Sequence, residues 1–128
     1  MKPDLIYTAF SFVKIMSDCL FCKIVQGTIP AKIIHRDDQV VAFHDINPQA
    51  PVHFLVVPVK HVSNLLEPAA VDGAMLSSVY RTVQKLTGES GLQNGFRVVA
   101  NCGSDGGQTV SHLHFHVLGK RPMAWPPG

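Results

Sequence analysis

The sequence predicts one α+β domain, in which an antiparallel sheet of about five strands packs with one long helix and one short N-terminal helix. A chain of 128 residues has the length of a single domain. Short segments rich in β-branched and aromatic residues alternate with turn residues, and residues 68–89 repeat apolar side chains at helical spacing. Hydrophobic residues make up 46% of the chain, which excludes a disordered protein.

The domain is expected to begin at residue 17, and residues 1–16 form an N-terminal extension in which Met16 is an alternative start. The apolar run at residues 5–13 is interrupted by Lys14, and no small-x-small cleavage site follows it. Both features disfavour a secretion signal.

The first half of the domain predicts a short helix and three strands. The helix is expected over residues 19–26, with Ser17 or Asp18 as its N-cap and Gly27 as its end. Residues 32–36 and 39–44 predict a hairpin, and residues 52–57 a third strand that ends at Pro58. The helix is expected to bury Phe21, Ile24 and Val25.

The second half predicts the long helix and two further strands. Pro68 suits the first turn of a helix that Gly88 or Gly91 ends. Residues 96–100 predict a strand, residues 101–108 a glycine-rich loop, and residues 109–118 the last strand. Alternation on that strand places Leu113, Phe115 and Val117 in the core, and Val110, His112, His114 and His116 on the other face. The apolar stripe of the helix is Val71, Met75, Val79, Val83 and Leu86.

Charge and cysteine content exclude several classes of protein. Eleven Lys and Arg oppose nine Asp and Glu, with no run of like charges, so nucleic-acid binding is not expected. No apolar stretch approaches the ~20 residues of a membrane span. Three cysteines, an odd number, indicate a reducing compartment, which we take to be the cytoplasm. Charged residues make up only 16%, which favours a surface covered by a second copy of the chain.

Histidine is the most informative residue type in this chain. Of seven histidines, His112, His114 and His116 alternate along one predicted strand. Same-face neighbours on a strand lie about 6.5–7 Å apart, so two such rings can share a metal. Burying three unrelated rings without partners would be costly, which disfavours a purely structural interpretation.

The glycine-rich loop before these histidines suits a phosphate group. Gly103, Gly106 and Gly107 offer backbone N–H groups, and Asn101, Gln108 and Thr109 add polar side chains. A neutral imidazole beside such a loop is a plausible nucleophile at phosphorus, because the loop offsets charge on the phosphate oxygens.

Several motifs together resemble the histidine triad family, and more narrowly its branch of nucleotide-binding phosphoramidases. The run His112-Leu-His-Phe-His-Val-Leu118 follows Gly106-Gly-Gln-Thr109 and precedes Trp125-Pro-Pro-Gly128. Residues 43–51, 53–58 and 101–107 also fall where that branch has closely similar segments. The resemblance extends from about Cys19 to Gly128.

This resemblance implies hydrolysis of purine nucleoside phosphoramidates without a catalytic cofactor. His114 would attack the α-phosphorus to form a nucleotidyl-histidine, which water then hydrolyses. His116 and His53 would contact phosphate oxygens, Thr109 would lie near the leaving group, and Asp45 would bind the ribose. Asn101, Gly107 and Gln108 would line the phosphate site, and the base slot would be Phe21, Ile24, Ile29, Phe43 and Ile46.

The resemblance also implies a structural metal and a homodimer. Cys19 and Cys22 have the spacing of half a zinc site, and related proteins complete it at the positions of His61 and His112. The alternative is a pair of reduced cysteines that act as small hydrophobic residues. The dimer would use the long helix and residues 96–100, with the C-terminal tail near the partner's site.

Two other functions stay open at this stage. A metal-dependent hydrolase could use the histidines as zinc ligands, although the loop and Asp45 would then have no role. The chain could also be a nucleotide-binding regulatory or scaffolding protein whose hydrolysis is incidental. Lys120 and Pro122 stand where the branch commonly has Gly and Gln, so the resemblance leaves the leaving group unassigned. The sequence does not indicate which purine is preferred.

Overall fold

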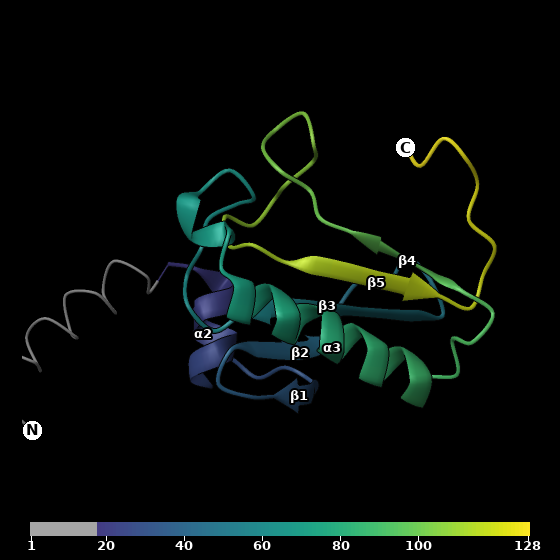
Figure 1. Cartoon of the computed structure of the whole chain (residues 1–128), viewed down its shortest axis with the longest axis horizontal. Coiled ribbons are helices and arrows are strands. Elements are labelled where there is room, and N and C mark those ends of the chain that lie inside the picture. Colours follow the sequence, from purple (N-terminus) through teal and green to yellow (C-terminus); the bar gives the residue numbers. More distant parts are fainter. Residues whose placement is uncertain (1–17) are drawn as a thin grey trace, which may run out of the picture.

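The computed structural model describes residues 18–128, so the predicted extension and the proposed cap Ser17 lie outside the described part. A five-stranded antiparallel sheet has the order β1-β2-β3-β5-β4 (Figure 1). Two α-helices and one short 3-10 helix accompany it, which confirms the predicted fold class. The elements are α2 (Leu20–Gln26), β1 (Ile33–Arg36), β2 (Val40–His44), β3 (Val52–Pro58), η1 (Pro68–Ala70), α3 (Gly73–Glu89), β4 (Phe96–Val99) and β5 (Phe115–Gly119).

Helix α2 begins one residue later than predicted, and its cap is a cysteine. The Sγ of Cys19 accepts the backbone N–H of Cys22, so neither Ser17 nor Asp18 is the N-cap. Gly27 ends the helix in a left-handed conformation with φ 79°, as predicted. The helix buries Phe21, Cys22 and Ile24, while Val25 is only half-buried.

Helix α3 also begins later than predicted, because Asp72 caps it. The Asp72 carboxylate accepts the N–H of Met75, and Pro68 instead opens the separate helix η1. Val71 therefore precedes α3 and is 82% exposed, which corrects its place in the apolar stripe. The rest of the predicted stripe is buried: Met75, Val79, Val83 and Leu86.

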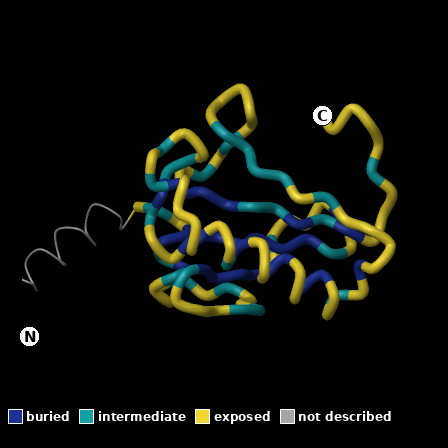
Figure 2. The backbone as a smooth tube through the Cα atoms, viewed as in Figure 1, coloured by how far each residue is buried: buried dark blue, intermediate teal, exposed yellow. Residues whose placement is uncertain are grey.

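The sheet is covered on both faces, and its central strands are buried (Figures 1 and 2). Helix α3 packs on the face that carries Phe54, Val56 and Val117. Helix α2 packs on the opposite face, where Leu55 and Val57 meet Phe21. None of the helices in residues 18–128 combines the length and the hydropathy needed to cross a membrane.

Strand β5 is shorter than predicted, since residues 109–114 belong to no strand. The register pairs Val56 with Phe115, so the next ladder bonds would involve Pro58, which has no N–H. The N–H of Leu113 donates instead to the carbonyl of Val62. The alternation still persists through this irregular segment, because Leu113 and Val117 join the α3 core as predicted.

Candidate functional site

Three histidines lie close together on the α2 side of the sheet: His53 on β3, His116 on β5, and His114 just before β5. His114 is 5% exposed and donates its Nδ1 proton to the carbonyl of His112 at 2.7 Å. A neutral imidazole carries one proton, so the lone pair of His114 resides on Nε2. The Phe21 ring packs edge-on against the His114 ring, with 5.0 Å between centroids. The nitrogen that keeps the lone pair and the orientation of the His114 ring are therefore both fixed.

A second chain of hydrogen bonds fixes the tautomers of His53 and His116. The backbone N–H of Gln49 donates to Nδ1 of His53 at 3.0 Å, so the proton of His53 resides on Nε2. That Nε2 lies 2.9 Å from Nδ1 of His116 and 3.3 Å from a carboxylate oxygen of Asp45. Because His53 donates, His116 accepts at Nδ1 and carries its own proton on Nε2. His116 therefore presents an N–H donor beside the His114 ring, 4.9 Å away between centroids.

Burial keeps these two rings neutral near pH 7. Burial and the neighbouring His114 and His53 lower the pKa of His116 to about 4, and the Asp45 carboxylate opposes this shift. Burial also lowers the pKa of His53, again against the charge of Asp45. His53 and His116 are therefore both neutral when the first donates to the second.

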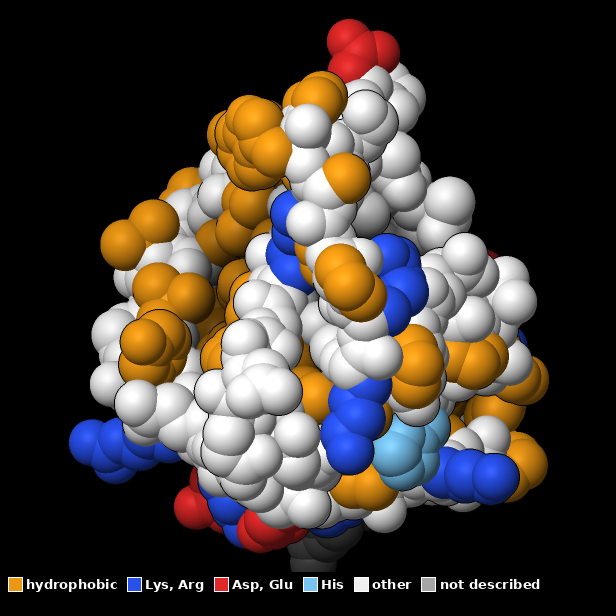
Figure 3. All heavy atoms as spheres, turned by 90° about the vertical axis from the view of Figure 1, so that its right-hand side faces the viewer, with side chains coloured by type: hydrophobic (Ala, Val, Ile, Leu, Met, Phe, Trp, Pro, Cys, Tyr) orange, Lys and Arg blue, Asp and Glu red, His pale blue; other side chains and the backbone are white. Residues whose placement is uncertain are grey.

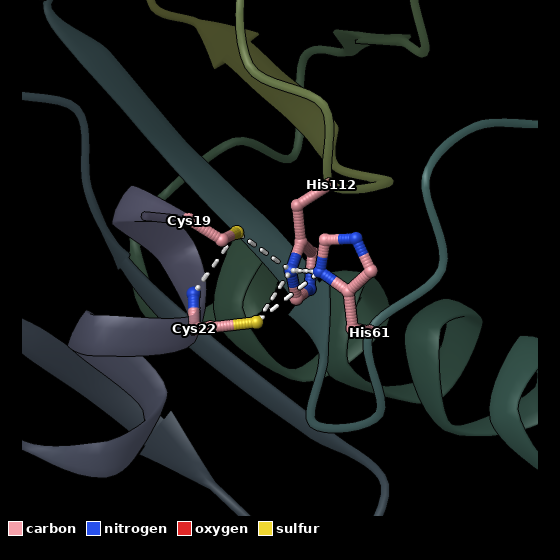
Figure 4. A group of neighbouring side chains, drawn as sticks. All are labelled: Cys19, Cys22, His61 and His112. Atoms are coloured by element: carbon pink, nitrogen blue, oxygen red, sulfur yellow. Dashed lines mark hydrogen bonds between the residues drawn. The ribbon is translucent and has the colours of Figure 1, made fainter. Parts of the chain in front are cut away.

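The four predicted metal ligands come together at the N-terminus of α2 (Figure 4). Nδ1 of His112 lies 3.4 Å from the Cys19 Sγ and 3.5 Å from the Cys22 Sγ. Nδ1 of His61 lies 3.2 Å from the Cys22 Sγ and 3.2 Å from Nδ1 of His112. A tetrahedral zinc with ordinary bond lengths requires about 3.3–3.6 Å between such ligand atoms. The donor set and its spacing therefore fit zinc.

Hydrogen bonds around the cluster support the same conclusion. Nε2 of His112 donates to the carbonyl of Pro58 at 2.9 Å, which leaves the Nδ1 lone pair directed toward the sulfur atoms. Burial and the neighbouring Cys19 thiol raise the pKa of Cys22 to about 12. A bound cation is what would ionise such a thiol at neutral pH.

A second group of three residues also brings possible metal ligands together, but the ring nitrogen of His53 that faces this group is protonated. Asp45, His53 and His116 bring one carboxylate and two imidazoles together. Since Gln49 donates to Nδ1 of His53, the Nε2 that faces the group carries a proton and has no lone pair for a metal. This arrangement disfavours the metal-dependent hydrolase considered from the sequence.

The glycine-rich loop forms turns, as predicted, and one of its side chains bonds across it. Gln108 accepts the N–H of Gly103 and donates to the carbonyls of Ser63 and Val110, all at 3.0 Å or less. Its amide therefore holds the loop in shape. The other predicted phosphate-side residues, Asn101, Gly107 and Thr109, are half-buried or exposed.

The predicted base slot is brought together only in part. Phe21, Ile24 and Phe43 are buried in the cluster under α2, and Ile29 packs against its edge. Ile46 is fully exposed and lies outside this cluster. The Asp45 side chain is 16% exposed, and one of its carboxylate oxygens lies 3.3 Å from Nε2 of His53.

Comparison with known proteins identifies the family. The model of the HIT domain matches residues 26–123. The chain belongs to the HIT domain family. It is 50% identical over 111 residues to an uncharacterized HIT-like protein of Synechococcus elongatus, an alignment that covers 87% of this chain and 97% of that protein.

Solved HIT structures share this fold. A HIT family hydrolase from Legionella pneumophila has a TM-score of 0.83 and 46% identity, over 87% of this chain and all of that one. A histidine triad nucleotide-binding protein from Candida albicans has a TM-score of 0.73 and 30% identity, over 85% of this chain and 83% of that one.

Two residues of this HIT domain that contact the site were not predicted. Gln49 holds His53 through its backbone N–H, and Arg121 donates to the backbone carbonyl of Gln49 at 3.0 Å. Both contacts involve main-chain groups, which no side-chain motif marks. Asn47-Pro48 marks only a turn there.

Proposed function

We propose that this HIT protein hydrolyses purine nucleoside phosphoramidates, of the adenosine phosphoramidate or adenylylated lysine type, through a covalent intermediate on His114. One observation carries the proposal: the hydrogen bond from Nδ1 of His114 to the His112 carbonyl leaves Nε2 as a nucleophile of fixed orientation. The names of a HIT family hydrolase and a histidine triad nucleotide-binding protein among similar structures support it.

In the first step, the Nε2 lone pair of His114 would form a bond to the α-phosphorus. The P–N bond would break, and its electron pair would leave with the amine, which takes a proton from solvent. Water would then attack the same phosphorus and lose a proton, while the bond to His114 breaks and Nε2 regains its lone pair. Nδ1 stays bonded to the His112 carbonyl throughout.

The neighbouring groups would stabilise charge on the phosphate. His116 carries its proton on Nε2 and can donate it to a non-bridging oxygen, and His53 holds His116 in that tautomer. Asn101, Gly107 and Gln108 would line the phosphate site from the loop, and Thr109 would lie on the leaving-group side. Asp45 and the cluster under α2 would bind the nucleoside.

We propose that Cys19, Cys22, His61 and His112 hold a structural zinc ion. The zinc would link α2 to the segments that follow β3 and precede β5, and it would supply no catalytic group. The cluster requires reduced thiols, which fits a cytoplasmic protein.

A second copy of the chain is the partner we propose. Strand β4 is an edge of the sheet, and its Phe96 and Val98 are 42% and 45% exposed. With Leu76 and Tyr80 of α3 they line a groove of about 460 Å³. Figure 3 views the right-hand end of Figure 1 and shows hydrophobic side chains gathered along its left side. A symmetric contact of two β4 edges would bury this surface and place the exposed Trp125 tails near it.

Turnover of adenosine phosphoramidate tests the enzymatic proposal. We expect His114→Ala to lower kcat by at least about a thousandfold while AMP binding, measured by calorimetry, is retained. Mass spectrometry of the quenched wild-type reaction should show a nucleotidyl adduct on His114. His44→Ala is the matched control, because His44 is exposed at the end of β2.

Three outcomes would contradict the proposal in different ways. Full turnover by His114→Ala would exclude the covalent mechanism. AMP binding without turnover or adduct by the wild type would indicate a nucleotide-binding scaffold. Loss of turnover on chelation of a folded protein, with no adduct at any stage, would indicate a metal-dependent hydrolase.

Analytical ultracentrifugation tests the dimer. Val98→Asp should shift the protein to the mass of one chain, because it places a charge on the proposed interface. Val71→Asp should not, because Val71 is 82% exposed and does not line the groove. A wild-type protein with the mass of one chain at micromolar concentration would refute the assembly.

A further inference from the structure

We propose that Arg121 is a positioning residue for the catalytic histidines. The inference rests on the proposed function, and it extends the site to the segment that follows β5. Arg121 is exposed and touches none of the histidines. It acts through Gln49, whose backbone N–H sets the tautomer of His53.

Three consecutive hydrogen bonds connect Arg121 to the site. Nε of Arg121 donates to the carbonyl of Gln49 at 3.0 Å, and the N–H of the same residue donates to Nδ1 of His53 at 3.0 Å. Nε2 of His53 then contacts Nδ1 of His116 at 2.9 Å. Gln49 is thus held on one side by Arg121 and itself holds His53 on the other.

Arg121 bonds to an exposed loop that has few contacts of its own beyond β3. Residues 46–49, between β2 and β3, are all exposed. Within the loop, Asp45 accepts the N–H of Asn47, and the Gln49 side chain donates to the carbonyl of Asn47. These local bonds shape the turn. Outside the loop, Gln49 bonds to His53 through its N–H, and its carbonyl accepts a hydrogen bond from Arg121, 72 residues further along the chain.

The backbone beside Arg121 supports a dedicated role. Lys120 has φ 68°, and among residues 18–128 it is the only non-glycine residue with a positive φ. A lysine rarely adopts this conformation unless the surrounding structure enforces it. The left-handed turn directly follows the last residue of β5 and precedes the residue that bonds to Gln49. The chain therefore keeps a strained turn at the point from which Arg121 reaches the loop.

Loss of Arg121 would release Gln49 and with it the donor that fixes His53. Only the Asp45 carboxylate, 3.3 Å from Nε2 of His53, would then favour the Nε2–H tautomer, so the second neutral tautomer would become populated. In that fraction His116 would lose its defined Nε2–H donor toward the phosphate. We expect Arg121→Ala to lower kcat about tenfold, the loss typical of one hydrogen bond to a charged donor, with little change in KM. The change in KM should be the smaller one, because the apolar cluster under α2 lies outside this chain of bonds and only Asp45 contacts it, through His53.

The experiment compares Arg121→Ala, Arg121→Lys and Arg97→Ala in the full-length protein. Arg97 is the matched control, because it also donates to a backbone carbonyl of the C-terminal segment, that of Ala124, at 2.9 Å. Two quantities are measured: the nitrogen chemical shifts of the His53 ring, which report its tautomer without substrate, and kcat and KM for adenosine phosphoramidate.

We expect mixed tautomers of His53 in Arg121→Ala, a single tautomer in Arg97→Ala, and partial recovery in Arg121→Lys, whose ammonium can still reach a carbonyl. An unchanged His53 tautomer in Arg121→Ala would overturn the inference, whatever happens to turnover. Mixed tautomers in both alanine variants would also overturn it, since a loosened tail would then suffice. If the wild type has no turnover at all, the proposed function fails, while the tautomer measurement still decides the role of Arg121.

Discussion

Acid should destabilise the folded protein through His116. In the folded state, burial and the neighbouring His114 and His53 lower the pKa of this imidazole from its usual 6.5 to about 4, and only Asp45 opposes them. The unfolded chain therefore binds a proton at a higher pH than the folded one. Stability contributed by the neutral ring is complete above pH 6.5 and is lost as the pH falls toward 4.

The size of the effect follows from the two pKa values. Each pH unit that separates them corresponds to about 1.4 kcal/mol. With values of 6.5 and about 4, the contribution of His116 to the free energy of unfolding should fall by about 2 kcal/mol between pH 7 and pH 5, and by about 3 kcal/mol between pH 7 and pH 4. The side chain is 20% exposed, so solvent screening reduces this figure only modestly.

Urea denaturation at pH 7, 5 and 4 measures this loss, and the variant His116→Asn isolates it. The variant should show a shallower pH dependence than the wild type by the amounts above, whereas His44→Asn, at an exposed position, should keep the wild-type slope. Proton NMR provides a direct test. Titration of the His116 ring near pH 6.5, or equal slopes in His116→Asn and wild type, would refute the reasoning.

Three further predictions follow from packing and the metal cluster. In thermal unfolding, the protein at a free zinc concentration a thousandfold above Kd should be about 4 kcal/mol more stable than the protein treated with a chelator. Cys22→Ser should abolish this difference, and Cys102→Ser should not. In Gly106→Ala, the added Cβ would clash with the carbonyl oxygen of Cys102 and distort the glycine-rich loop, so AMP affinity should fall at least about tenfold. Gly88→Ala, which has open space on α3, should instead raise the stability by about 0.5–1 kcal/mol. Leu113→Ala, at a position 1% exposed, should cost about 3 kcal/mol in urea denaturation; a loss below 1 kcal/mol would contradict the packing described here.

Local patterns predicted most of the fold because the elements depend on them. The hairpin of β1 and β2 and the stripe on α3 are set by residues that are neighbours in sequence. The predicted starts of β5 and α3 were wrong, because they depend on a contact across the sheet and on a choice between two capping signals. The start of β5 is decided by Pro58, which meets it only across the sheet. The start of α3 is decided by Asp72, whose capping signal stands in the sequence but competes with that of Pro68.

The site shows the same division between side-chain motifs and main-chain contacts. The spacing of Cys19 and Cys22 and the alternation of the histidines predicted which residues gather. The tautomers could not be predicted, because carbonyl and amide groups of Pro58, His112 and Gln49 set them. Such groups are the same in every residue, so only the folded chain shows which ring nitrogen each one faces.

His112 shows why these main-chain contacts matter for function. Its ring is one corner of the Cys/His cluster, and its backbone carbonyl accepts the Nδ1 proton of His114. Phe21, between the two cysteines in sequence, packs against the rings of both histidines, at 6.0 and 5.0 Å between centroids. The cluster therefore contacts His114, the proposed nucleophile, through one peptide group and one aromatic ring. In the proposed mechanism the cluster has no group at the phosphorus, yet a change in it would alter the groups that orient His114.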